Sequence, residues 1–146
     1  MLIEPDIRAG VIWAGAVYSY ADFVKYGIDD HTYRPPATQE NLEENEHLRS
    51  SRIIFDIYGW PDPEVDYWRA VSLTENIEFM MAPLQIHHAE DDPVVNIGYS
   101  FKLAGILQVN SKVYEFYTYE SGGHNLISPY FDQAMLRTVK FIQDNL

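Results

Sequence analysis

The sequence predicts an α/β protein built on a parallel sheet with helices packed against it. Three segments have the apolar, β-branched and aromatic composition of strands, and the last two are each followed by a segment with helical spacing. Strands that alternate with helices in this way are typical of right-handed β-α-β crossovers, which make neighbouring strands parallel. With 146 residues, 47% of them hydrophobic, the chain is large enough for one globular domain.

The first strand is predicted at residues 8–17, RAGVIWAGAV, an apolar run with small residues interleaved that is typical of a strand buried on both faces. Aromatic and turn-forming residues follow over 18–36, where Pro35 and Pro36 exclude a helix. We therefore expect a loop or a lid there. Nothing ahead of Arg8 is long enough to supply a neighbouring strand, so the sheet is expected to be incomplete on that side.

Two helices are predicted between the first strand and the second. Apolar residues recur over about residues 38–58, and Gly59 is placed to end that helix. Asp62 before Pro63 predicts the start of a shorter helix, because aspartate suits the N-cap and proline the first helical turn.

The second half of the chain alternates more clearly. Residues 83–88 (PLQIHH) and 112–119 (KVYEFYTY) are predicted strands, and residues 97–109 between them have helical spacing. Ser128 and Pro129 then precede a closing helix. Its apolar stripe recurs every three or four residues and consists of Phe131, Met135, Val139, Ile142 and Leu146.

Charge and composition exclude several classes of protein. Twenty-two acidic residues against 10 basic ones give a net charge of -12, which would repel nucleic acid and anionic lipid, so neither nucleic acid nor membrane is an expected partner. No apolar run could span a bilayer, and the first residues are acidic, so we expect a cytoplasmic protein. The absence of cysteine excludes disulfides and thiolate catalysis. We expect neither a cofactor nor a metal.

An acid and a histidine follow the last two predicted strands. Asp92 lies in the segment after the first of these strands, and His124 lies in the segment after the second, 32 residues later. Because the carboxyl ends of parallel strands meet at one edge of a sheet, we expect the two side chains to lie close together. A carboxylate that accepts the ring N–H of a histidine fixes its tautomer and stabilises the imidazolium that forms when it takes a proton.

The neighbouring histidines on the second strand have a different interpretation. His87 and His88 are adjacent, so they point to opposite faces of the sheet and cannot both bind one metal ion from a regular strand. We expect His88 to be a buried, hydrogen-bonded structural residue.

The stretch APLQIHHAEDDPVV, followed later by ESGGHNL, resembles the end of an α/β-hydrolase, particularly of the prolyl oligopeptidase and dienelactone hydrolase branch. In that family a pattern P-hydrophobic-hydrophobic-x-H-G-x-x-D-x-x-V carries the acid of the catalytic triad, and a later G-G-H carries its histidine. Alignment on His88 implies that Asp92, rather than Asp91, is the acid, with Ala89 in place of the usual glycine. His124 matches the triad histidine.

Further segments extend the resemblance, but one part of the pattern is missing. IRAGVIWAGAV resembles the sixth strand of the family, and DYWRAVSLTENI resembles the stretch that leads into the seventh. The family's nucleophile lies in a G-x-S-x-G turn after the fifth strand, and no serine here has that setting. The nearest imitation, Gly98-Tyr99-Ser100-Phe101-Lys102, falls inside a predicted helix, and we place it on the helix surface.

The resemblance implies the C-terminal portion of an α/β-hydrolase fold. Residues 1–146 would form a single partial domain, with a helical cap-like insertion at about 18–76 and the acid and histidine loops within 77–146. The chain would then be the acid-base half of a serine hydrolase that cleaves ester or peptide bonds. His124 would be the general base, Asp92 would orient it, and the serine would come from elsewhere. This polypeptide alone is expected to be inactive.

Two other interpretations stay open. The chain could be a non-catalytic α/β domain that self-associates or binds a partner through the edge of its sheet, since an unpaired apolar strand is a template for pairing. If the chain is instead half of a serine hydrolase, the expected partner at the same edge is a complementary N-terminal half. The third interpretation is a metal site formed by His88, Glu90, Asp91 and His124.

Overall fold

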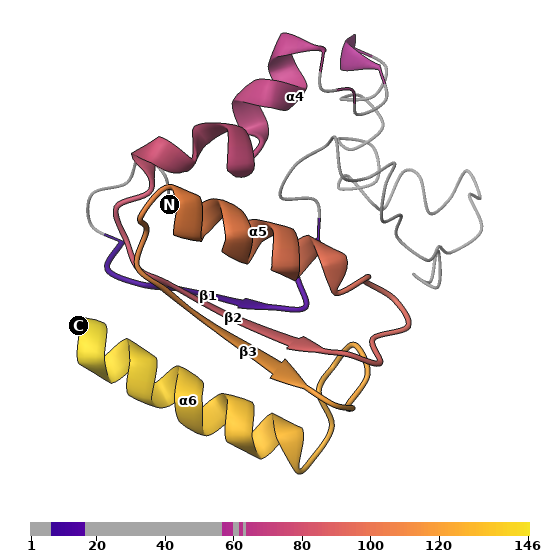
Figure 1. The fold of residues 1–146 in the computed structure, drawn as a ribbon, viewed down its shortest axis with the longest axis vertical. Coiled ribbons are helices and arrows are strands. Elements are labelled where there is room, and N and C mark those ends of the chain that lie inside the picture. Colours follow the sequence, from indigo (N-terminus) through magenta and orange to yellow (C-terminus); the bar gives the residue numbers. More distant parts are fainter. Residues whose placement is uncertain (1–6, 17–56, 60–61, 63) are drawn as a thin grey trace, which may run out of the picture.

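The computed structural model describes residues 7–16, 57–59, 62 and 64–146. In chain order its elements are strand β1 (Gly10–Trp13), helix α4 (Asp66–Val71), the 3-10 helix η1 (Thr74–Phe79), strand β2 (Leu84–Ala89), helix α5 (Gly98–Val109), strand β3 (Tyr114–Tyr119) and helix α6 (Tyr130–Asn145). Among these residues the three strands form one parallel sheet in the order β1-β2-β3. Figure 1 shows α5 on one face of the sheet and α6 on the other. The predicted α/β architecture, a parallel sheet with flanking helices, is confirmed.

The middle strand is the most deeply buried part of the sheet. All six residues of β2 are buried, because it has a strand on either side and a helix on each face. The four residues of β1 are only half-buried, since in the described part of the chain this strand pairs with β2 alone. The prediction that the strand within residues 8–17 is buried on both faces was therefore wrong. The strand buried on both faces is β2.

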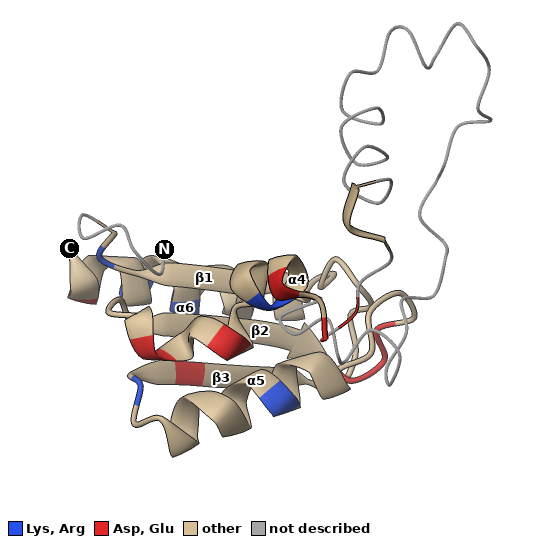
Figure 2. Ribbon diagram, turned by 90° about the horizontal axis from the view of Figure 1, so that it is seen from above, with Lys and Arg blue, Asp and Glu red and all other residues tan. Residues whose placement is uncertain are grey.

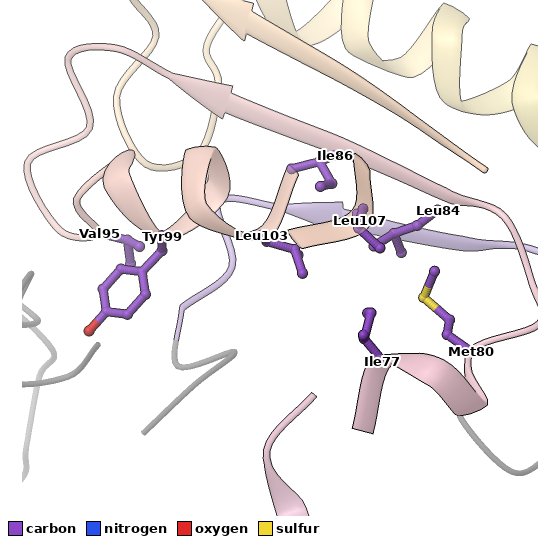
Figure 3. Close-up of a cluster of buried hydrophobic side chains, with 8 residues drawn as sticks. All are labelled: Ile77, Met80, Leu84, Ile86, Val95, Tyr99, Leu103 and Leu107. Atoms are coloured by element: carbon purple, nitrogen blue, oxygen red, sulfur yellow. The ribbon is translucent and has the colours of Figure 1, made fainter. Parts of the chain in front are cut away.

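A hydrophobic core joins β2 to α5 and η1 (Figure 3). Leu84 and Ile86 point from β2 toward α5, which presents side chains at four-residue intervals along one face. The eight buried residues of this cluster are Ile77, Met80, Leu84, Ile86, Val95, Tyr99, Leu103 and Leu107. Each large aliphatic side chain buried in this way stabilises the fold by roughly 1.5 to 3 kcal/mol. Because Ile86 precedes the loop between β2 and α5 and Tyr99 follows it, the core holds both ends of this loop.

The opposite face of β2 carries a buried polar network under α6. His87 Nδ1 lies 2.8 Å from the Tyr119 hydroxyl, and His87 Nε2 lies 2.7 Å from Gln85 Oε1. An amide oxygen only accepts, so Nε2 carries the ring proton and the Tyr119 hydroxyl donates to Nδ1. Arg137 of α6 donates to the Tyr119 oxygen at 3.2 Å. Burial, together with the nearby Arg137 charge, lowers the pKa of His87 to about 4.

The predicted closing helix forms as α6, but its apolar stripe does not face the sheet. Ala134 and Phe141 are the buried residues of α6, whereas all five members of the apolar stripe are exposed. The stripe lies to one side of the buried face, next to β1, since the Phe131 ring contacts Trp13 at a centroid distance of 5.7 Å. The periodicity identified the helix correctly but does not tell which neighbour covers each side of it.

The region before η1 differs from the prediction in one respect. Helix α4 begins at Asp66 rather than at Asp62. The Asp62 carboxylate accepts the N–H of Glu64 at 2.8 Å and so forms a turn ahead of the helix instead of capping it. The predicted lid at 18–36 and most of the predicted helix at 38–58 lie outside the described residues.

Acidic residues outnumber basic ones in the described part of the chain. Figure 2 shows acidic positions on α4, on β3 and in the loops at the end of the sheet, with few basic positions between them. No helix in the described part of the chain is long and apolar enough to cross a membrane.

The lowered pKa of His87 makes stability depend on pH. In the folded protein the ring stays neutral down to about pH 4, whereas in the unfolded chain it takes a proton below its ordinary pKa of 6.5. The free energy of unfolding should therefore fall as the pH is lowered from 6.5 to about 4. The difference in pKa corresponds to about 3 kcal/mol. Urea denaturation at several pH values measures this dependence. His87→Leu should make the free energy of unfolding depend less steeply on pH. The dependence that remains would come from His88, whose pKa is also lowered. An unchanged slope would contradict the assignment.

Candidate active site

The loop after β2 is built around the carboxylate of Asp92. Its side chain is 1% exposed, and its Oδ1 accepts the backbone N–H groups of Val94 and Val95 at 2.8 and 2.9 Å. The buried Val95 side chain ties the same turn to the hydrophobic core. The carboxylate is therefore fixed by its own loop, with Oδ2 left to face its neighbours.

The loop after β3 turns back sharply through two glycines. Gly122 and Gly123 have φ angles of +133° and +61°, which side chains rarely adopt. The turn is closed by the N–H of Ile127, which donates to the Gly122 carbonyl at 3.0 Å. A Cβ added at Gly122 would lie 3.2 Å from the Cα of Leu126, so the turn also needs the space that glycine leaves. This turn places His124 at the carboxyl edge of the sheet.

The structure brings Asp92 and His124 together. His124 Nδ1 lies 3.0 Å from Asp92 Oδ2, and the His124 side chain is 35% exposed. A carboxylate only accepts hydrogen bonds, so Nδ1 is the protonated ring nitrogen, and Nε2 of the neutral ring carries the lone pair. The pair thus has a buried acid and an imidazole that solvent can reach. Such a pair can take a proton from a hydroxyl placed at Nε2.

Opposing effects set the charge of Asp92. Burial acts to raise the pKa of this carboxyl, but hydrogen bonds from the Val95 N–H, from His124 and from the Val94 N–H outweigh it and hold the pKa below its usual value. Asp92 is therefore ionised at neutral pH. An ionised acid stabilises the imidazolium that His124 forms when it takes a proton.

His88 lies against Asp92 from inside the protein. It is fully buried, as expected, with Nδ1 2.7 Å from the Ser100 hydroxyl and Nε2 3.0 Å from the Val95 carbonyl oxygen. The prediction that Ser100 lies on the surface of a helix was wrong, because it is fully buried against this ring on α5. Burial lowers the pKa of His88, although the Val95 carbonyl and the Asp92 carboxylate favour its protonated form.

The adjacent Asp91 has a contact that sequence analysis missed. Its Oδ1 accepts the backbone N–H of Gly123 at 2.9 Å. The two consecutive aspartates therefore hold two consecutive residues of the histidine loop, Asp91 through a backbone group and Asp92 through the ring of His124. In the sequence this contact corresponds to an Asp-Asp pair 32 residues ahead of Gly-His. That pattern alone does not predict which group of the histidine loop Asp91 would contact.

The two other expectations for this region concern metal and nucleophile. Among the described residues no group of three or more histidine, aspartate and glutamate side chains could hold a metal ion, so the site proposed for His88, Glu90, Asp91 and His124 does not form. In the same part of the chain, no serine hydroxyl is hydrogen-bonded to the His124 ring, whose hydrogen-bond partner is Asp92.

Comparison with known proteins shows likeness of fold. No protein-family model matches the sequence, and a search of curated proteins gives no match either. Among solved structures, the acylaminoacyl peptidase of Pyrococcus horikoshii matches 99% of this chain over 21% of its own, with a TM-score of 0.66 at 16% identity. The dipeptidyl peptidase 4 of Porphyromonas gingivalis matches 60% of this chain over 13% of its own, with a TM-score of 0.54 at 17% identity.

An esterase belongs to the same group of structures. The esterase Est2 of Thermogutta terrifontis matches 94% of this chain over 42% of its own, with a TM-score of 0.51 at 15% identity. The parallel sheet with flanking helices is therefore that of the α/β-hydrolase fold. The chain spans between 13% and 42% of the length of these three proteins.

The two glycines of the histidine loop should differ in their tolerance of a side chain. Gly122→Ala combines a forbidden φ of +133° with a close approach to the Leu126 Cα, so it should lower the free energy of unfolding by about 1 to 3 kcal/mol. Gly123→Ala is the matched control, because φ is +61° and nothing lies within 4 Å of the added Cβ. Denaturant titration of both variants tests the ranking. Equal losses would show that the space at Gly122 has no role.

Proposed function

We propose that this chain is the acid-base half of a serine hydrolase that cleaves ester or peptide bonds. The observation that carries the proposal is the 3.0 Å contact between His124 Nδ1 and Asp92 Oδ2 at the carboxyl edge of a parallel sheet. In this function His124 is the general base that removes the proton of a serine hydroxyl, and Asp92 orients the ring. A general base so placed accelerates the chemical step by roughly 10² to 10⁴-fold.

The nucleophile and the donors for the oxyanion come, on this proposal, from a complementary N-terminal half. The chain covers only 21% of the acylaminoacyl peptidase and 42% of the esterase that it resembles in fold, which leaves room for that half in a larger protein. Without a serine and paired backbone N–H groups near His124, no acyl-enzyme can form. A cytoplasmic location stays a prediction.

The docking place that we propose for this half is the open side of β1. In the described part of the chain β1 pairs only with β2, so no described strand covers its other edge. The apolar stripe of α6 lies beside that edge, where Phe131 touches Trp13. A strand added next to β1 and a helix packed on α6 would cover both surfaces together.

The second candidate function is a non-catalytic α/β domain that binds itself or a partner. The same open edge and the same apolar stripe favour it, since neither needs a serine. The hydrolase requires Asp92 and His124 for its reaction, whereas a binding domain does not need them.

Activity distinguishes the two. The 146-residue chain should hydrolyse an activated ester such as p-nitrophenyl acetate no faster than background, and turnover should appear when the N-terminal half is restored. In the restored protein, His124→Ala should abolish turnover, and Asp92→Asn should lower kcat by on the order of 10⁴-fold.

The matched control for this experiment is Asp91→Asn, which keeps an oxygen to accept the Gly123 N–H and should change kcat much less. Steady-state kinetics measure all three variants. If Asp91→Asn were the crippling change, the assignment of the acid would be wrong. Equal activity of the isolated chain and the restored protein would contradict the proposal as a whole.

The exposed surfaces also predict association of the isolated chain. Light scattering over micromolar concentrations should show a mass that rises with concentration, because the open edge of β1 and the apolar stripe can pair between copies. Val139→Lys, within the stripe, should weaken this association. Gln133→Lys adds the same charge on another face of α6 and should leave it unchanged. A stable monomer at every concentration would contradict the prediction.

A further inference from the structure

We propose that His88 is a positioning residue that holds the carboxylate of Asp92 toward His124. The inference rests on the proposed function, since it assigns a residue that supports the acid-base pair. It starts from three residues that are all buried on the α5 side of the sheet: His88 at the end of β2, Ser100 on α5, and Asp92 in the loop between them.

The tautomer of His88 follows from its neighbours. The Val95 carbonyl oxygen, 3.0 Å from Nε2, can only accept, so Nε2 carries the proton. Nδ1 then has the lone pair and accepts the hydroxyl of Ser100 at 2.7 Å. Both ring nitrogens therefore have partners on different elements, and the ring cannot turn over without losing both hydrogen bonds.

His88 acts on Asp92 in two ways. Its Nε2 lies 3.2 Å from Asp92 Oδ2, the oxygen that also receives the His124 N–H. In addition, His88 holds the carbonyl of Val95, whose own N–H donates to Asp92 Oδ1. The ring thus fixes the turn that grips one carboxylate oxygen and lies directly against the other.

The series Ser100, His88, Asp92 has the residue types of a catalytic triad but not its accessibility. Ser100 and His88 are fully buried, and the Asp92 side chain is 1% exposed, so no substrate can reach the hydroxyl. The Ser100 hydroxyl donates a hydrogen bond to a ring whose other nitrogen lies against the Val95 carbonyl and the Asp92 carboxylate. The role that this geometry leaves to His88 is to position the acid.

The test reads the tautomer of His124, which reports where the Asp92 carboxylate points. Nitrogen-15 spectra of the histidine rings, recorded at a pH high enough to keep them neutral, distinguish Nδ1–H from Nε2–H. In the unmodified chain we expect His124 with Nδ1–H, against the preference of free histidine for Nε2–H, and His88 with Nε2–H. Any other tautomer of either ring in the unmodified chain would overturn the proposal without the need for a variant.

Two variants of His88 then form a matched pair. The amide nitrogen of His88→Gln can occupy the place of Nε2 and donate to Val95, whereas the shorter side chain of His88→Asn reaches only as far as Nδ1, beside Ser100. We expect His124 to keep Nδ1–H in His88→Gln and to shift toward Nε2–H in His88→Asn. His87→Gln, on the opposite face of the sheet, is the control and should leave His124 unchanged.

Each outcome with the variants decides the question. Retention of the Nδ1–H tautomer in His88→Asn overturns the positioning role. Loss of it in both variants also overturns that role, because burial of the ring rather than its N–H donor would then be what matters. The measurement uses neither a serine nor a substrate. If hydrolysis by the restored protein failed while the tautomers followed the expected pattern, only the proposed function would be lost.

Discussion

The burial of β2 on both of its faces is the constraint on which the rest of the structure depends. Alternate residues of this strand enter two different environments, an apolar core under α5 and a polar network under α6. His87 and His88 are adjacent in sequence, yet each is buried in a different layer with both ring nitrogens hydrogen-bonded. Because polar groups buried without partners are costly, these contacts fix the strand in one register. The loop that carries Asp92 starts from that fixed position.

The neighbouring carboxylates of Asp91 and Asp92 make different contacts with the histidine loop. Asp92 is buried, has a lowered pKa and faces an imidazole, whereas Asp91 is exposed and holds a backbone group of the opposite loop. The exposed contact contributes little free energy by itself, but it restricts the loop whose two glycines otherwise add conformational freedom. Asp92 thus orients the imidazole of His124, and Asp91 holds the loop that carries it.

Local patterns in the sequence predicted the parallel sheet and the approach of Asp92 to His124, since both depend on alternation and on loops at one edge of a sheet. Two of the failures are of one kind. The half-burial of β1 and the burial of Ser100 depend on what another part of the molecule covers. Hydrophobic spacing identifies a helix with an apolar side, but it does not name the surface that meets that side. The start of α4 was missed because Asp62 forms a turn instead of a cap.

Asp92, His124 and the residues that hold them come from one crossover unit, β2-α5-β3, and from the loop that follows it. His88, Asp92, Ser100 and His124 lie within 37 consecutive positions, from 88 to 124, so their contacts with one another involve no other part of the chain. The relative orientation of Asp92 and His124 therefore depends on contacts within this unit. A hydroxyl group placed beside the His124 ring would meet a partner whose orientation Asp92 already sets, so less reorganisation would be needed before a proton could be transferred.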